Sequence, residues 1–258
     1  MATVNVYSVK GGSAGTVEVP AAFSAEYRPD LIKKAVLAAS ANGRQPYGPN
    51  PLSGLRHSVS TWGKGRGVAR VQRLRDGRRA TESPNNISGR RAHPPRVGRK
   101  WEQKVNKKEL KAARISALAA TASAECVRAR GHQFDDKVAF PIVVDDALND
   151  VQTAAEVREL FDAIGIGHDV DRAKKGTKIR AGRGKMRNRK YRVPVSVLIV
   201  VSDKERGAPV FKGANNLPGV EVEEIDTLNT SLLAPGGDAG RLTVYTKAAI
   251  ERIGEWTQ

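Results

Sequence analysis

Val195-Ser-Val-Leu-Ile-Val-Val201 points most directly to the fold, because Ser196 is its one polar residue and the others are β-branched residues or leucine. A near-continuous apolar run of this length is typical of a parallel strand that is buried on both of its faces. The run is too short to cross a bilayer, which takes about 20 apolar residues in a helix. We therefore expect a parallel sheet that is covered by helices.

Strand and helix patterns alternate on both sides of this run. Short apolar or alternating runs predict further strands at 4–8, 16–19, 142–144, 219–223 and 242–245, with a turn at 11–15. Apolar residues at helical spacing predict helices over 29–42, 106–131, 153–165, 228–233 and 247–256. Asn106 with Glu109, and Thr153 with Glu156, match the spacing of helix capping pairs. This alternation indicates an α/β fold: a three-layer domain with a mostly parallel sheet and helices on both faces.

A 60-residue segment, 42–101, interrupts the alternation between two predicted helices. It holds fourteen Arg or Lys against Asp76 and Glu82, together with nine Gly and six Pro. A second run, 172–192, has eleven Arg or Lys and no acid. The runs carry +12 and +11, which sum to +23, so the rest of this +17 chain carries −6. We expect a single α/β domain (1–41 with 102–258) that is interrupted by an extended basic loop at 42–101 and has a second basic loop at 172–192.

The sequence also indicates the cellular compartment of the protein. The N-terminal residues Met1-Ala-Thr-Val-Asn5 lack the basic and apolar regions of a signal peptide. Cys126 is the one cysteine, so no disulfide forms within the chain, and its Ala-rich helical surroundings predict a buried small apolar side chain. We expect a soluble cytoplasmic protein that has no membrane partner.

Candidate chemistry is sparse. Gly63-Lys-Gly-Arg-Gly67 resembles a phosphate-cradling loop, but it follows no predicted strand and opens no predicted helix, so we interpret it as flexible backbone that approaches phosphates. The four histidines are scattered, with no Cys or carboxylate at metal-ligand spacing: His57, His93, His132 and His168. We expect no metal, no cofactor and no small-molecule substrate.

Three aspartates support the main enzymatic alternative, a Mg²⁺-dependent nucleic-acid-processing enzyme. Asp145 and Asp146 follow one predicted strand and Asp203 closely follows another, and ligands bind beyond the carboxyl ends of parallel strands. Carboxylates at that edge are suited to holding Mg²⁺ for phosphoryl transfer. Asp is also common in turns and helix caps, and no nucleophile or general-base pair accompanies these residues. We therefore expect caps there, and a protein that is not an enzyme.

The two basic runs favour nucleic-acid binding. Alone, a chain of this composition has too little apolar area to offset its ordering entropy. Along a polyphosphate it releases condensed counterions and forms bidentate Arg contacts. Arg outnumbers Lys twelve to two in 42–101, which suits close phosphate contacts. No helix-turn-helix, zinc-finger or basic-zipper pattern is present, so we favour RNA over DNA; a general chromatin or nucleoid binder is a third reading.

Aromatic residues add to this prediction. Tyr47, Trp62 and Trp101 are suited to stacking on unpaired bases, although Trp101 borders a predicted helix and is equally suited to core packing. The predicted RNA-binding residues of the first run are Arg44, Arg56, Trp62, Lys64, Arg66, Arg70, Arg73, Arg75, Arg78, Arg79, Arg90, Arg91, His93, Arg96, Arg99 and Lys100. Those of the second run are Lys178, Arg180, Arg183, Lys185, Arg187, Arg189, Lys190 and Arg192.

Five segments together resemble one known family. They are Gly63-Lys-Gly-Arg-Gly67, Ser88-Gly-Arg-Arg-Ala-His-Pro-Pro95, Arg114-Ile-Ser-Ala-Leu-Ala-Ala-Thr121, the run 178–192, and Ala234-Pro-Gly-Gly-Asp-Ala-Gly-Arg-Leu-Thr-Val244. In order and spacing they are similar to ribosomal protein four of the large subunit, in its archaeal form. The Ala-His-Pro-Pro and Ala-Pro-Gly-Gly segments are the specific ones. Residues 68–76 depart from the archaeal pattern in their high density of arginine.

The resemblance implies a structural protein, and not an enzyme, that binds 23S-type ribosomal RNA in the large subunit and supports subunit assembly. It implies that the basic loop at 42–101 threads inward through the RNA. The tip, near residues 64–85, would then help line the peptide exit tunnel beside ribosomal protein twenty-two.

Overall fold

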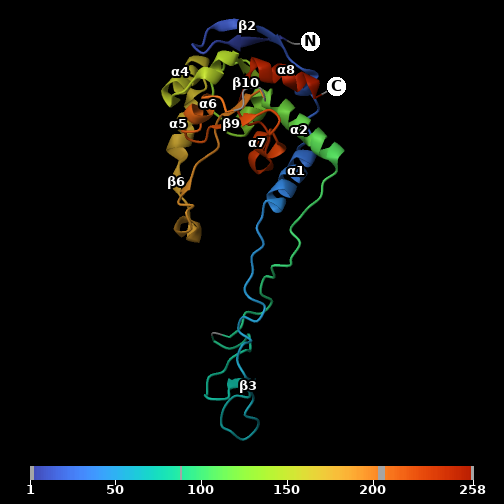
Figure 1. Ribbon diagram of the computed structural model, residues 1–258, viewed down its shortest axis with the longest axis vertical. Helices are drawn as coiled ribbons and strands as arrows, with labels where there is room; N and C mark the ends of the chain where they lie inside the picture. Colours follow the sequence, from blue (N-terminus) through green and yellow to red (C-terminus); the bar gives the residue numbers. More distant parts are fainter. Residues whose placement is uncertain (1–2, 88, 203–206, 257–258) are drawn as a thin grey trace. The chain divides into compact units, whose positions relative to one another are not determined.

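The computed structural model describes residues 3–87, 89–202 and 207–256 (Figure 1). The chain divides into two units, residues 1–40 with 104–258, and residues 41–103. The first unit is called the domain and the second the arm.

A six-stranded sheet forms the middle of the domain. Its strands are β1 (Thr3–Tyr7), β2 (Ser13–Glu18), β5 (Ile142–Val144), β8 (Leu198–Val201), β9 (Glu221–Glu224) and β10 (Thr243–Thr246). They lie in the order β2-β1-β5-β10-β8-β9. Only β1 and β2 pair antiparallel, and every other neighbouring pair is parallel. The prediction of a mostly parallel sheet is confirmed.

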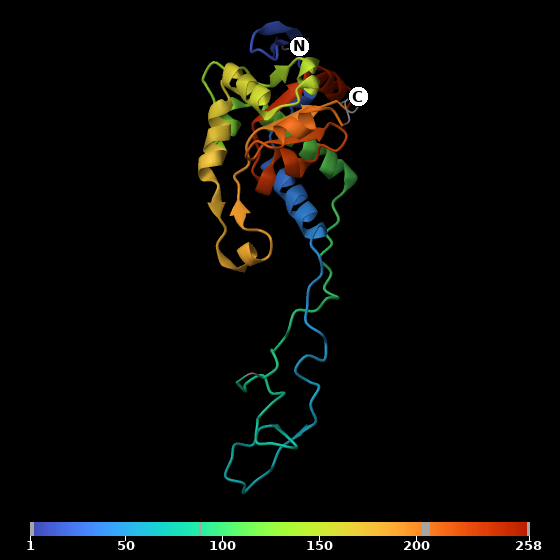
Figure 2. The same ribbon diagram turned by 60° about the vertical axis from the view of Figure 1, so that its left-hand side comes forward.

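Helices pack on both faces of this sheet (Figures 1 and 2). The helices are α1 (Pro29–Asn42), α2 (Lys107–Thr121), α3 (Ala124–Ala129), α4 (Ala154–Ile164), α5 (Gly167–Gly176), α6 (Val210–Ala214), α7 (Thr230–Leu233) and α8 (Lys247–Glu255). Successive strand side chains point to opposite faces, so Ile199 and Val244 pack with α4, α5 and α6, whereas Val200 and Tyr245 pack with α1, α2, α7 and α8. The three-layer prediction is therefore confirmed.

Local signals set several of these boundaries. Thr153 Oγ1 accepts a hydrogen bond from Glu156 N at 3.3 Å, as the predicted capping pair requires. Gly165 ends α4 with φ +92°, a left-handed conformation that favours glycine. The helix predicted over 29–42 has the observed bounds of α1, and the strand predicted over 142–144 those of β5.

The helix predicted over 106–131 is wrong as one element. It breaks after Thr121, and Ser123 caps a second helix by accepting a hydrogen bond from Cys126 N at 3.4 Å. Asn106 precedes α2 but forms no side-chain cap. Its expected partner Glu109 instead accepts a hydrogen bond from Lys34 at 2.8 Å. Cys126 is half-buried against the core and not fully buried as expected.

The predicted loop at 172–192 begins too early, because its first residues belong to α5. That helix was missed, since its second turn is rich in Lys and Arg and only Val170 and Ala173 suggest an apolar face. After it come β6 (Lys178–Ile179), a short 3₁₀ turn over Gly182–Met186, and β7 (Tyr191–Arg192). Residues 177–192 are called the hairpin.

The arm contains little regular structure. Its strands β3 (Val59–Ser60) and β4 (Arg73–Leu74) pair antiparallel. Among its described residues, 41–87 and 89–103, none is buried. Without buried apolar surface the arm has no hydrophobic core of its own. No helix in the described part of the chain is long and apolar enough to span a bilayer.

Candidate nucleic-acid interface

The base of the arm is closed by contacts between its two ends. Asn42 Nδ2 donates a hydrogen bond to Gln103 O at 3.1 Å, and Gln103 N donates to Asn42 Oδ1 at 2.8 Å. The guanidinium groups of Arg44 and Arg99 lie over the Trp101 ring, 4.4 and 4.3 Å from its centroid. Each such cation–π contact stabilises the pair by about 0.5–1 kcal/mol at an exposed site. Trp101 therefore pairs with two arginines within the arm and is not part of the domain core.

The turn between β3 and β4 is open and rich in glycine. Gly63, Gly65 and Gly67 have φ of +78°, +76° and +66°, and a Cβ atom on any of them would meet nothing within 4 Å. The segment does follow a strand, the two-residue β3, but it opens no helix. The expectation that this segment is flexible backbone that approaches phosphates stays a prediction.

Arg73 has a structural role beside this turn. Its guanidinium lies 5.6 Å from the Trp62 ring centroid, and it donates hydrogen bonds to Arg78 O and Ala69 O. These bonds use donors that a phosphate would otherwise take. Arg73 thus helps to shape the end of the arm.

Most of the other predicted arm residues are exposed. Apart from Arg73 and Arg90, which are half-buried, all the Arg and Lys side chains of 42–101 are exposed, as is His93. In the described part of the arm, no Arg or Lys lies within 4 Å of a carboxylate. The basic side chains of the arm are therefore not neutralised by ion pairs with the residues that the structure describes.

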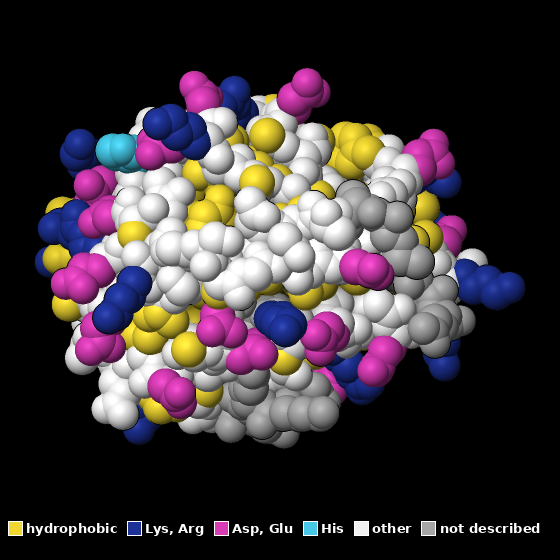
Figure 3. Space-filling view, turned by 90° about the horizontal axis from the view of Figure 1, so that it is seen from above, with side chains coloured by type: hydrophobic (Ala, Val, Ile, Leu, Met, Phe, Trp, Pro, Cys, Tyr) yellow, Lys and Arg dark blue, Asp and Glu magenta, His cyan; other side chains and the backbone are white. Residues whose placement is uncertain are grey.

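The hairpin is a second exposed basic element. Lys178 lies opposite Arg192 and Ile179 opposite Tyr191, and Arg180 N donates a hydrogen bond to Lys190 O at 2.8 Å. Its eight predicted binding residues are all exposed. Like charges directly opposite each other destabilise a strand pair, so a polyanion would stabilise the hairpin. By contrast, the domain face with β2, α4 and α8 shows acidic and basic side chains interspersed (Figure 3).

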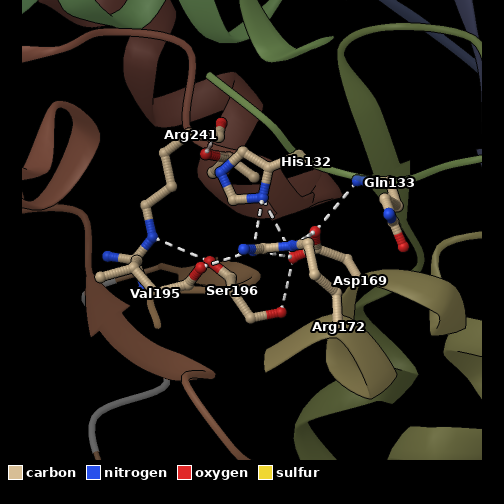
Figure 4. Close-up of polar contacts among 8 residues, drawn as sticks. His132, Gln133, Asp169, Arg172, Val195, Ser196 and Arg241 are labelled. Atoms are coloured by element: carbon tan, nitrogen blue, oxygen red, sulfur yellow. Dashed lines mark hydrogen bonds and ion pairs between the residues drawn. The ribbon is translucent and has the colours of Figure 1, made fainter. Parts of the chain in front are cut away.

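A buried polar centre holds the base of the hairpin (Figure 4). Asp169 in α5 is fully buried, and its carboxylate accepts hydrogen bonds from His132 Nδ1 at 3.0 Å and Ser196 Oγ at 2.7 Å. Arg172 Nε donates to the same carboxylate at 2.8 Å, and Arg172 Nη2 donates to Val195 O at 2.7 Å. These contacts join the segment before the hairpin to the segment after it.

The carboxylate of Asp169 is ionised in this centre. Burial is the largest influence on its pKa and would raise it, but the hydrogen bonds from His132, Arg172 and Ser196 and the electrostatic interaction with His132 together outweigh burial. The pKa of Asp169 therefore lies well below its ordinary value. The side chains of His132 and Asp169 are 2% and 0% exposed, and Ser196 Oγ donates to Asp169 and not to a histidine. An activated serine must be accessible to a substrate and must donate its hydrogen bond to a general base such as histidine. Ser196 does neither, so the cluster is structural.

Arg241 is a buried basic residue that the sequence analysis did not single out. It is fully buried; Arg241 Nε donates a hydrogen bond to Ser196 O at 3.1 Å, and Nη1 donates to Glu221 at 2.6 Å and to Leu232 O at 3.1 Å. The signal available in the sequence was its place between Gly240 and a β-branched strand, within the specific segment 234–244. The arginine of that segment serves the fold.

The aspartates of the enzymatic alternative act as caps where the structure describes them. Asp145 Oδ1 accepts a hydrogen bond from Asp146 N at 2.9 Å, and Asp146 Oδ1 accepts one from Ala248 N in the first turn of α8, also at 2.9 Å. Asp203 lies outside the described residues. Within the described residues no group of three or more His, Cys, Asp or Glu is placed to hold a metal ion. The geometry does not favour a Mg²⁺ site.

Comparisons with known proteins cover nearly the whole chain. The model of the ribosomal protein L4/L1 family matches residues 17–256. The large ribosomal subunit protein uL4 of Archaeoglobus fulgidus is 51% identical over 251 residues, which are 97% of this chain and 98% of that protein. The uL4 proteins of Methanosphaera stadtmanae and Methanopyrus kandleri are 47% and 48% identical, over 100% and 97% of this chain and 98% of each relative.

Proposed function

Because the chain belongs to the ribosomal protein L4/L1 family, we propose that this large-subunit ribosomal protein binds 23S-type ribosomal RNA through the arm and the hairpin. The proteins it resembles are named as ribosomal proteins and not as enzymes, and this chain is likewise not an enzyme. It is located in the large ribosomal subunit in the cytoplasm. RNA and neighbouring ribosomal proteins are its partners.

One observation carries the proposal: most Arg and Lys side chains of the arm and of the hairpin are exposed, and none of them pairs with a carboxylate among the described residues. Each phosphate that such side chains contact releases condensed counterions. Arg residues add bidentate hydrogen bonds to phosphate oxygens. The glycines of the arm permit bends between RNA segments, because they accept positive φ without strain.

The arm also suits a role in subunit assembly. It has no buried residue of its own among those described, so the surface that orders it is expected to be the folded RNA. The domain holds both ends of the loop. In this proposal the tip near residues 64–85, which includes most of the turn between β3 and β4, reaches the wall of the peptide exit tunnel beside ribosomal protein twenty-two.

Binding of the full-length protein to 23S-type RNA and to duplex DNA of equal length, at equal salt, tests the RNA-binding proposal. We expect a clear preference for the ribosomal RNA, and co-sedimentation with large subunits that survives a moderate salt wash. If about 8 phosphates are contacted, the slope of log affinity against log salt should be about −6 to −7. Equal affinity for duplex DNA would indicate a general nucleoid binder and overturn the proposal.

The tunnel position needs its own test. Arg70→Cys in a Cys126→Ser background would carry a photo-cross-linker at the open turn of the arm. We expect cross-links to a stalled nascent chain and to protein twenty-two in assembled subunits. Cross-links to ribosomal RNA alone would place the turn away from the tunnel.

A further inference from the structure

A groove lies within the arm, between the outgoing segment 49–55 and the returning segment 90–99. Its volume is about 1160 Å³. Sites for small molecules measure roughly 300–1,000 Å³, so this groove has room for more than one nucleotide-sized group. Three residues of the specific segment Ala92-His-Pro-Pro95 line it: His93, Pro94 and Pro95. The positive charge of the arm does not by itself explain the two prolines of this segment.

Two glycines let the walls of the groove approach each other. A Cβ atom on Gly48 would come within 2.6 Å of Pro95 O, and one on Gly54 within 2.6 Å of Arg90 Cβ. Real Cβ atoms essentially never come this close to such neighbours. Any larger residue at 48 or 54 would therefore push the two segments apart. The outgoing segment is also braced locally, because Leu52 N donates to Asn50 Oδ1 at 2.9 Å and Leu55 N to Leu52 O at 3.0 Å.

The lining combines two kinds of surface. Four arginines and one histidine contribute to it, with no Asp or Glu among the lining residues: Arg90, Arg91, Arg96, Arg99 and His93. Proline rings form much of the remaining wall: Pro49, Pro51, Pro94 and Pro95. Guanidinium groups pair with phosphate oxygens, and the apolar rings of proline offer a surface for contact with the face of a base. An unpaired nucleotide offers both a phosphate and a free base face, whereas a duplex hides its base faces in the stack.

We propose that this groove binds a short unpaired segment of RNA, with its phosphates on the arginines and its bases against the proline walls. The proposal rests on the function proposed above and adds to it a defined site with a defined nucleic-acid conformation. Elsewhere on the arm, exposed charges contact phosphates without regard to whether the bases are paired. At the groove, a base-paired segment of RNA would not bind, because its base faces are hidden in the stack.

Gly48→Ala tests the groove without changing charge, and Gly77→Ala is its matched control. Neither glycine has positive φ, and a Cβ atom at Gly77 would meet nothing within 4 Å. The full-length proteins would be cross-linked by ultraviolet light to 23S-type RNA and the cross-linked peptides mapped. We expect cross-links from residues 90–99 to unpaired nucleotides, reduced about tenfold in Gly48→Ala through loss of base contacts and unchanged in Gly77→Ala. Cross-links from the hairpin should persist in both variants.

A second pair of variants separates the groove from general charge. Arg90→Gln with Arg91→Gln removes two charges at the groove, and Arg78→Gln with Arg79→Gln removes two elsewhere on the arm. We expect only the first pair to abolish protection of the unpaired nucleotides from single-strand-specific nuclease.

Equal effects of the two pairs, or cross-links from 90–99 to duplex RNA, would overturn the groove proposal. In those cases the wild-type protein would still prefer ribosomal RNA, and the proposed function would stand. Loss of that preference in the wild-type protein would instead contradict the proposed function itself.

Discussion

Ser196 Oγ donates a hydrogen bond of 2.7 Å to Asp169 Oδ2, and this contact joins the two chain segments that flank the hairpin. Both side chains are fully buried. The hairpin between them places Lys178 opposite Arg192, which is unfavourable for the pair. The buried contact therefore holds the two ends of the hairpin together, although the like charges on its two strands repel each other.

Asp169→Asn is expected to destabilise the domain. The change removes the ionised partner of His132 and Arg172. Loss of one member of a buried ion pair lowers the free energy of unfolding by about 3–5 kcal/mol. Denaturant titration of the full-length protein measures the free energy of unfolding. Asp136→Asn is the control, since its side chain is 89% exposed and pairs with Arg128 at the surface; a change within about 0.5 kcal/mol is expected there. Similar small losses in both variants would contradict the role of the buried carboxylate.

The same carboxylate predicts how stability depends on acid. The pKa of Asp169 is lower in the folded protein than in the unfolded chain, where it is about 3.9. Its contribution is therefore fully present above about pH 4 and is lost as the pH falls below that value towards the folded pKa. Unfolding free energies of the wild type should fall more steeply between about pH 4 and pH 2 than those of Asp169→Asn. Parallel pH profiles for the two proteins would show that Asp169 does not carry this dependence.

Deletion of residues 44–100 with a short Gly/Ser join should leave the domain folded. The deleted residues contribute no buried side chain among those described, so the cooperative melting of the domain should persist. Affinity for 23S-type RNA should drop sharply, because the largest uncompensated basic segment is lost. A neutral Gly/Ser loop of the full original length is the control for connectivity and should bind as weakly as the deletion. Unchanged RNA affinity in the deletion would rule out the arm as the main contact.

Charge removal on the hairpin should change the salt dependence of binding. Arg187→Gln with Arg189→Gln removes two exposed charges, and each lost phosphate contact reduces the slope of log affinity against log salt by about 0.7–0.9. We expect a slope that is shallower by about 1.4–1.8 in binding titrations at several salt concentrations. Lys10→Gln with Lys247→Gln removes two exposed charges outside both basic elements and should leave the slope unchanged. Equal changes in both double variants would indicate a diffuse charge effect with no defined contact at the hairpin.

Much of the fold could be predicted because its signals are local. The run 195–201 identified a buried strand, although β8 itself covers only Leu198–Val201. Thr153, Glu156 and Gly165 identified both ends of α4. The break between α2 and α3 was missed, because Ser123 reads as a helix residue unless its capping bond to Cys126 N is known. The helix α5 was missed because a run of basic residues conceals its apolar face.

For the candidate site too, the features that depend on composition could be predicted, and the contacts of single residues could not. The excess of Arg, Gly and Pro in 42–101 is a property of composition and indicates a polyanion partner without any structure. The roles of single residues are not local. Trp101 pairs with Arg44 across the base of the arm, Arg73 binds carbonyl oxygens of its own turn, and Arg241 is buried at the domain centre. Residue type alone would assign all three arginines to RNA.

The sequence by itself determined the α/β class, the two basic elements and the family, because each depends on residue types, their periodicity and their order along the chain. Only the tertiary structure decided that His132, Asp169 and Ser196 form one buried centre and that Gly48 and Gly54 bring two distant segments together around a groove. These contacts join residues between 27 and 47 positions apart. Which distant residues meet depends on the path of the folded chain, and no local propensity encodes that path.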